Sequence, residues 1–128
     1  MKECVLIFRM DITTEEVQPT KEQMEVYMHR WMLWINNISE RGQLANGGNH
    51  FSREGKLLRS QNVITDGPYT KDKESVTGYI IIHAKNIDDA VSIANDCPIL
   101  QGEGTSVEVR ETATPGTMKD VKRTIAGS

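Results

Sequence analysis

The sequence predicts one α+β domain in which two helices cover one face of an antiparallel sheet. Residues 78–82 form an apolar run with no polar face, which is typical of a strand inside a sheet. Two segments have apolar residues at helical spacing, and apolar or alternating runs precede and follow each of them. The predicted order is strand, helix, strands, strand, helix, strand. This is the split β-α-β pattern of ferredoxin-like domains.

Composition sets the class of protein. The chain has 128 residues, 38% of them hydrophobic and 26% charged, as expected for a single globular domain. A net charge of -3 provides no general attraction for nucleic acid or anionic membranes, so direct nucleic-acid binding is not expected. Cys4 and Cys97 match no metal-ligand spacing, and we expect free thiols, no metal and no cofactor. No segment approaches the ~20 apolar residues of a membrane span, so a cytoplasmic protein is expected.

The first half of the chain contains the clearest helix signals. Residues 5–8 form a short apolar run and predict the first strand. Thr20 and Gln23 have the spacing of a capping box, which begins a helix. Gly42 is a typical helix stop. One face of this helix is apolar and is expected in the core; it consists of Met24, Tyr27, Met28, Trp31, Ile35 and Ile38.

The second half contains the remaining strands and the second helix. Residues 43–49 are glycine-rich. A hairpin turn is expected at 53–56, before strand-like residues 57–58 and 63–64. Residues 79–84 predict the central strand. Asn86 is expected to cap a helix whose apolar face is Ile87, Ala90, Val91 and Ala94. Val107 and Val109 alternate with charged residues, as in a half-exposed last strand. We predict a domain over residues 1–111 and a loosely docked tail over 112–128.

The predicted sheet has an apolar face that the two helices do not cover. This face carries the outward side chains of residues 5–8 and 79–82. Leaving such side chains in water forgoes ~1.5–3 kcal/mol each. We therefore predict a homodimer in which two sheets pack face to face with symmetric contacts. The alternative is a monomer whose tail folds across the sheet, with Met118, Val121 and Ile125 as anchors.

A family resemblance rests on an ordered set of short motifs along the chain. These are Phe8-Arg9, Gln23-Met24, Trp31, Trp34-Ile35, Gly42, Gly55-Lys56, Asp66-Gly67-Pro68-Tyr69, Lys73-Glu74, Gly78-Tyr79-Ile80-Ile81, Ala90, Cys97-Pro98 and Val107-Glu108-Val109-Arg110. Over about positions 4 to 111 the chain resembles YCII-related proteins of the DGPF type. The resemblance implies a dimeric α+β barrel of ferredoxin-like subunits. The chain departs from the family at Lys71, where an acidic residue is usual, and at His50, where an aliphatic one is common.

The resemblance leaves two classes of function open, and it does not decide whether the chain is an enzyme. Some relatives are small-molecule enzymes, which implies a ligand pocket between helices and sheet with Asp66 as the acid or base. Other DGPF proteins are associated with alternative sigma factors, which implies a non-catalytic regulatory or interaction module. A basic group in the tail, at Lys119, Lys122 and Arg123, is interrupted by Asp120 and is interpreted as solvated.

Asp66 and His29 are the candidate catalytic residues. Asp66 follows strand-like residues and precedes Gly67-Pro68, so its carboxylate is placed to act as a general acid or base. Its alternative role is to accept backbone N–H bonds within the turn. His29 lies away from the apolar face of the first helix, where it either lines a crevice or faces water. His50 and His83 have weaker claims.

Three basic residues are candidates for binding an anionic ligand. Arg9 and Arg110 lie at or near predicted strand ends, and Lys73 precedes the central strand. The alternative is that these side chains pair with carboxylates such as Glu108, because strand-end charges commonly pair.

Overall fold

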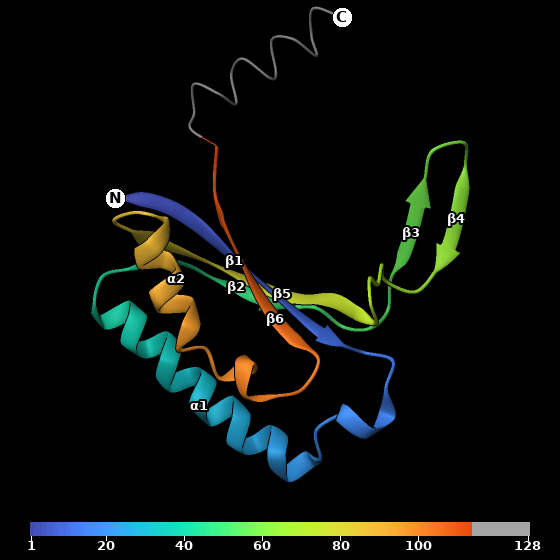
Figure 1. The fold of residues 1–128 in the computed structure, drawn as a ribbon, viewed down its shortest axis with the longest axis horizontal. Helices are drawn as coiled ribbons and strands as arrows, with labels where there is room; N and C mark the ends of the chain where they lie inside the picture. The colour runs from blue at the N-terminus through green and yellow to red at the C-terminus, as the bar shows by residue number, and fades with distance from the viewer. Residues whose placement is uncertain (114–128) are drawn as a thin grey trace, which may run out of the picture.

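The structure is a computed structural model that describes residues 1–113; the part of the predicted tail from residue 114 on lies outside the described residues. Figure 1 shows the path of the chain. The label η denotes a short 3-10 helix. The elements are β1 (Lys2–Asp11), η1 (Glu15–Val17), α1 (Lys21–Glu40), β2 (Leu44–His50), β3 (Lys56–Arg59), β4 (Val63–Asp66), β5 (Glu74–Ala84), α2 (Ile87–Asn95), η2 (Pro98–Gln101) and β6 (Thr105–Glu111).

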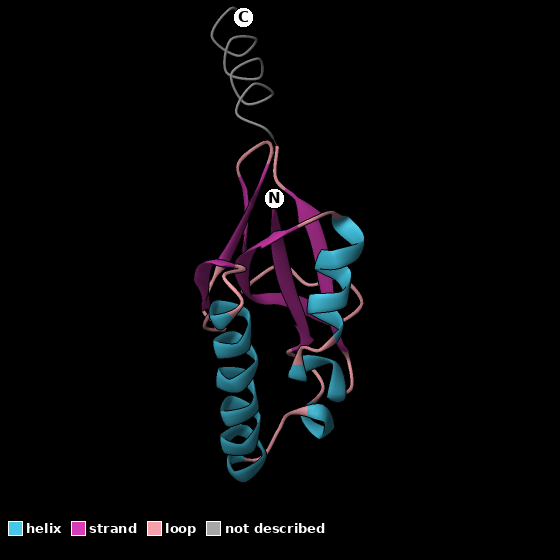
Figure 2. Cartoon of the chain, turned by 90° about the vertical axis from the view of Figure 1, so that its left-hand side faces the viewer, coloured by secondary structure: helices cyan, strands magenta, loops and turns pink. Residues whose placement is uncertain are grey.

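The main sheet has the strand order β2-β5-β1-β6, and each neighbouring pair is antiparallel. α1 connects β1 to β2, and α2 connects β5 to β6, so each helix crosses over one intervening strand. Both helices lie on the same side of the sheet (Figure 2). β3 and β4 form a separate two-stranded hairpin that projects from the sheet (Figure 1). The predicted ferredoxin-like fold is confirmed, with this hairpin inserted between β2 and β5.

The core lies between the sheet and the helices. Alternate residues of β1 and β5 point toward the helices, as the two-residue period of a strand requires. Phe8 packs edge-on against Trp31, with ring centroids 4.8 Å apart. Trp34 donates its indole N–H to the carbonyl of Ile93 at 3.2 Å, which joins α1 to α2. The buried apolar residues are Cys4, Leu6, Phe8, Trp31, Trp34, Ile38, Ile80, Ile82, Ala84, Ala90, Ile93, Ala94, Cys97 and Ile99.

Both ends of α1 are where the sequence predicts them. The Gln23 N–H donates to the Thr20 hydroxyl at 3.1 Å, and the Thr20 N–H donates to the Gln23 side chain at 2.9 Å, so the capping box is confirmed. Gly42 has φ +71° just past the helix. The N–H groups of Gly42 and Gln43 bond the carbonyls of Ser39 and Ile38, which is a Schellman motif.

The apolar face of α2 differs from the expectation in part. Asn86 caps the helix as predicted, since its side chain accepts the Asp89 N–H at 2.8 Å. Ala90 and Ala94 are buried, but Ile93 is the third buried residue, while Ile87 and Val91 are exposed. The helix is therefore rotated so that Ile93 lies in the core.

The strand β2, which occupies Leu44–His50 at the sheet edge, was not among the strands expected from the sequence. Its register against β5 shifts twice, which explains the absence of an alternating pattern. Gly48 has φ +63°, and a Cβ there would lie 1.6 Å from the Tyr79 carbonyl oxygen. The hairpin turn also lies later than expected, where Gln61 and Asn62 adopt positive φ between β3 and β4.

The second face of the sheet is apolar along its centre. Val5 and Ile7 of β1 lie beside Tyr79 and Ile81 of β5, and all four are half-buried. Within residues 1–113, both helices lie on the opposite face (Figure 2). We call this surface the open face. No helix among the described residues is long and apolar enough to cross a membrane.

Candidate functional site

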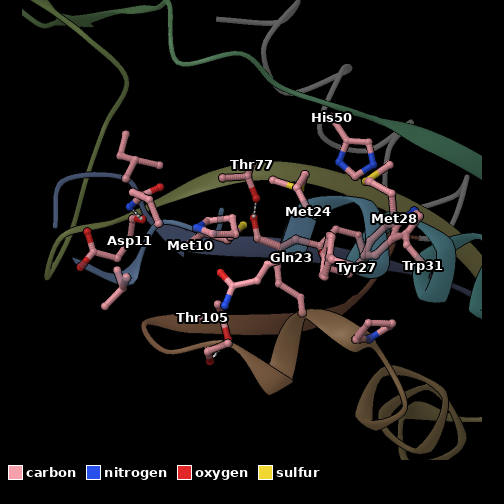
Figure 3. A pocket seen from close by; sticks show the side chains of 18 of the residues that line it. Met10, Asp11, Gln23, Met24, Tyr27, Met28, Trp31, His50, Thr77 and Thr105 are labelled. Carbon is pink, nitrogen blue, oxygen red and sulfur yellow. Dashed lines mark hydrogen bonds between the residues drawn. The ribbon is translucent and has the colours of Figure 1, made fainter. Parts of the chain in front are cut away.

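A large cavity lies at the N-terminal end of α1, between this helix and the sheet. Its volume is about 1040 Å³. Its walls come from the end of β1, the segment 12–19, the first half of α1, residues 50–53, Pro68, the start of β5 and the segment 98–105. Figure 3 shows side chains from several of these segments around one space.

One wall of the cavity is aromatic and rich in methionine. Trp31 packs between Phe8 and the His50 ring, whose centroid lies 5.2 Å from that of Trp31. Tyr27 lies 6.1 Å from Trp31 by the same measure. His50, Met28 and Trp31 lie together at one end of the view in Figure 3. The apolar lining side chains include Phe8, Met10, Met24, Tyr27, Met28, Trp31 and Phe51.

Two methionines that the helical pattern assigns to the core are in fact cavity wall. Met24 is 40% exposed and Met28 is 38% exposed, whereas Trp31 on the same face is 5% exposed. Methionine is flexible and polarisable, so it adapts to differently shaped apolar partners. The pattern therefore identified the inward face of α1 correctly, but part of that face borders space.

Asp11 is a structural carboxylate at one end of the cavity. It accepts the N–H of Thr14 at 2.9 Å, and the N–H and hydroxyl of Thr13 at 2.8 and 2.9 Å. These hydrogen bonds from Thr14 and Thr13 hold the pKa of Asp11 well below its ordinary range. Asp11 is thus ionised near neutral pH and orders the segment that follows β1, rather than exchanging protons.

Tyr27 and His50 offer polar groups to the cavity. Burial raises the pKa of Tyr27 above its ordinary value, so its hydroxyl stays protonated and can donate a hydrogen bond. Neither that hydroxyl nor the His50 ring forms a hydrogen bond with another residue in 1–113. A ligand in the cavity therefore meets an aromatic wall with two polar atoms able to orient it.

A polar contact joins two walls at the mouth of the cavity. The side-chain amide of Gln18 donates to the carbonyls of Asp11 and Thr14 at 2.8 and 3.0 Å. Its carbonyl oxygen accepts a hydrogen bond from Arg53. The segment after β1 is thereby held against the segment after β2.

The sequence-predicted catalytic residues lie outside this cavity lining. Asp66 ends β4 on the projecting hairpin, where its carboxylate pairs with Lys56 at 2.6 Å and the side chain is 89% exposed. His29 is exposed on α1, and its neighbours Arg30 and Met28 line the cavity instead. The structure does not bring Asp66 and His29 together with the cavity wall. Their roles in catalysis stay predictions.

Of the three predicted anion-binding residues, Arg9 and Arg110 meet on the open face. Arg9 donates to Glu108 at 2.7 Å, and Arg110 donates to the second oxygen of Glu108 at 3.1 Å. These bonds, that from Arg9 first, lower the pKa of Glu108. Lys73 is exposed just before β5 and forms no ion pair with another residue in 1–113. Both arginines therefore pair with a carboxylate, which is the alternative to anion binding that the sequence left open. The role of these residues in binding an anionic ligand stays a prediction.

The two cysteine thiols are protonated, and the described residues contain no cluster of metal-ligating side chains. Burial raises the pKa of Cys97 to about 12 and also raises the pKa of Cys4, so both thiols stay protonated near neutral pH. Within residues 1–113, no three His, Cys, Asp or Glu side chains gather to hold a metal ion. The absence of a cofactor requirement stays a prediction.

The cavity lining includes His50, for which the sequence supported only a weak claim, and Tyr27 and Met28, which the helical pattern assigns to the core. One signal was available, because His50 replaces the aliphatic residue that is common in the family. The other two could not be distinguished from core residues, because helical spacing reports the inward face but not what lies opposite it.

Comparison with known proteins establishes the family. The YCII-related domain matches residues 11–113, which is most of the chain, and the protein therefore belongs to the YCII-related family. A search of curated proteins gives no match. Among solved structures, the chain is similar to 5-chloro-2-hydroxyhydroquinone dehydrochlorinase from Burkholderia phenoliruptrix, in complex with 2,5-dihydroxybenzoquinone. The two are 19% identical, the match covers 82% of this chain and 90% of the other, and the TM-score is 0.40.

Proposed function

We propose that this YCII-related protein binds a small molecule with an apolar, ring-sized body in the cavity beside α1. The observation that carries the proposal is a volume of about 1040 Å³ with a wall of aromatic and methionine side chains. Ligand pockets typically measure ~300–1,000 Å³ and combine an apolar lining with a few polar groups. Tyr27 and His50 supply such groups here.

The composition of the wall also indicates that the cavity is a ligand site and not a defect in packing. Met24 and Met28 remain exposed although both line the same space. Each fully buried large apolar side chain contributes ~1.5–3 kcal/mol relative to exposure, so covering this wall with an apolar ligand is favourable. Bound ligand then stabilises the folded protein by mass action.

A bulky substitution tests the location. Met28→Trp places a larger side chain in the lining, whereas Met32→Trp places the same side chain on the same helix at an exposed position outside the lining. We expect a panel of aromatic and heterocyclic compounds to raise the melting temperature of the wild type and of Met32→Trp. The same compounds should raise the melting temperature of Met28→Trp less. Equal shifts in all three proteins would place binding elsewhere and refute the proposal.

We further propose that two copies pair through the open face. The open face has a continuous apolar strip on the two central strands, made of Val5, Ile7, Tyr79 and Ile81. Symmetric packing of two copies would remove this strip from water. Ile7→Glu would place a charge in the strip. Leu33→Glu changes an equally apolar residue on the exposed side of α1 and serves as the control. In sedimentation velocity, we expect a dimer for wild type and Leu33→Glu and a monomer for Ile7→Glu; a monomeric wild type contradicts the proposal.

A further inference from the structure

The charges around the cavity are unevenly distributed. Four carboxylates line it, and two guanidinium groups, Arg30 and Arg53, oppose them. The lining therefore has two more negative than positive side chains. The carboxylates belong to Asp11, Glu16, Glu22 and Glu103.

Both arginines at the cavity are already hydrogen-bonded to neutral amides. Arg30 donates to the side chain of Gln101 at 2.7 Å, and Arg53 donates to Gln18. Glu16, Glu22 and Glu103 are exposed and form no ion pair with any other residue in 1–113. A neutral amide leaves the guanidinium charge in place, so the lining keeps an excess of two negative charges.

The acidic side chains would not define a site on their own; the cavity and its aromatic wall do, and the carboxylates determine which charge fits. The half-buried Tyr27 ring lines the cavity, and an aromatic face attracts a cation through its quadrupole. The Tyr27 ring and the excess of carboxylates therefore both favour a positively charged ligand.

The N-terminus of α1 acts in the opposite direction. A helix N-terminus carries partial positive charge and favours anions. The capping box engages the N–H groups of Thr20 and Gln23, and Glu22 lies in the same first turn. Lys21 is exposed and is not part of the lining. The helix end therefore reduces the preference for a cation without reversing it.

We propose that the ligand of this cavity is an organic cation, with an apolar or aromatic body and a protonated or quaternary nitrogen near the acidic rim. This inference rests on the proposed small-molecule function and adds the charge of the ligand. A rim charge in high dielectric is screened beyond about 8 Å at physiological salt, so we expect about a fivefold preference for a cation over a matched anion.

Three probes of the same size measure the preference. 2-Phenylethylamine is cationic, 2-phenylethanol is neutral and phenylacetate is anionic at pH 7.5. Ligand-observed NMR titration should give the tightest binding for the amine and the weakest for the carboxylate, with the difference decreasing as salt rises. The double variant Glu16→Gln/Glu22→Gln should weaken amine binding and leave alcohol binding unchanged. Glu25→Gln, an exposed residue on the same helix outside the lining, is the matched control.

The outcomes separate the two proposals. Equal affinity for all three probes, or tighter binding of phenylacetate, overturns the charge preference and leaves the small-molecule site in place. Amine binding that is lost equally in Glu25→Gln and the double variant overturns the assignment of the rim carboxylates. Failure of every probe to bind overturns the small-molecule function and this inference together.

Discussion

The two halves of α1 differ, although both turn an apolar face toward the sheet. In the C-terminal half, Trp31, Trp34 and Ile38 are buried. In the N-terminal half, Met24 and Met28 remain exposed along the cavity. α1 has 20 residues and α2 has nine, so α1 extends about 16 Å farther at 1.5 Å per residue. α2 lies beside the C-terminal half of α1 (Figure 1). The cavity forms along the first half of α1, where the short η2 is the helical neighbour.

Truncating the core half should cost far more stability than truncating the cavity half. Trp34→Ala removes a buried ring and leaves the Ile93 carbonyl without its indole donor, so we expect a loss of ~3–5 kcal/mol in the free energy of unfolding. Met28→Ala removes exposed atoms and should cost less than ~1 kcal/mol. Urea unfolding followed by circular dichroism measures both. Similar losses for the two variants would mean that the cavity half is packed as tightly as the core.

Ligand binding should show the reverse sensitivity, with His50 more important than Asp66. His50→Gln removes a ring that contacts Trp31 and lines the cavity, and losing such a polar contact costs ~0.5–1.5 kcal/mol, or up to about tenfold in Kd. Asp66→Asn changes an exposed side chain on the hairpin and should leave Kd within about twofold. Isothermal titration with a compound found by thermal shift distinguishes them. A larger effect of Asp66→Asn would support the role predicted from the sequence and move the site toward the hairpin.

The sequence predicted the core half of the molecule better than the cavity half. Capping at Thr20, the stop at Gly42 and the cap at Asn86 are local features, because each depends on hydrogen bonds to residues within a few positions. β2 was missed because its fit to β5 depends on a close backbone approach at Gly48, which no local pattern encodes. The cavity depends on the relative lengths and placement of α1 and α2, and these are tertiary properties. The same limit explains why Met24 and Met28 looked like core residues.

Substitutions at the two ends of α1 should have smaller effects, and they also distinguish the cavity half of the helix from the core half. Thr20→Ala removes the capping box beside the cavity, and we expect ~1 kcal/mol less stability together with weaker ligand binding, because the first turn frays. Gly42→Ala places a side chain at φ +71°, which should cost ~1 kcal/mol at the core end. Ligand affinity should be unchanged in Gly42→Ala. Equal loss of affinity in both variants would show that the cavity responds to overall stability and not to its own end of the helix.

The smallest expected effect is a pH dependence of stability that arises from Asp11, at one end of the cavity. Because the pKa of Asp11 is lower in the folded protein than in the unfolded chain, its hydrogen bonds to Thr13 and Thr14 stabilise the fold fully above about pH 4. That stabilisation is lost as the pH falls below this value toward the folded-state pKa. Asp11→Asn should therefore lower the urea midpoint at pH 6 and converge on the wild type at acidic pH, whereas Asp72→Asn, at an exposed turn residue with positive φ, should show no such convergence. Parallel pH profiles for wild type and Asp11→Asn would mean that the carboxylate does not order the segment that closes the cavity.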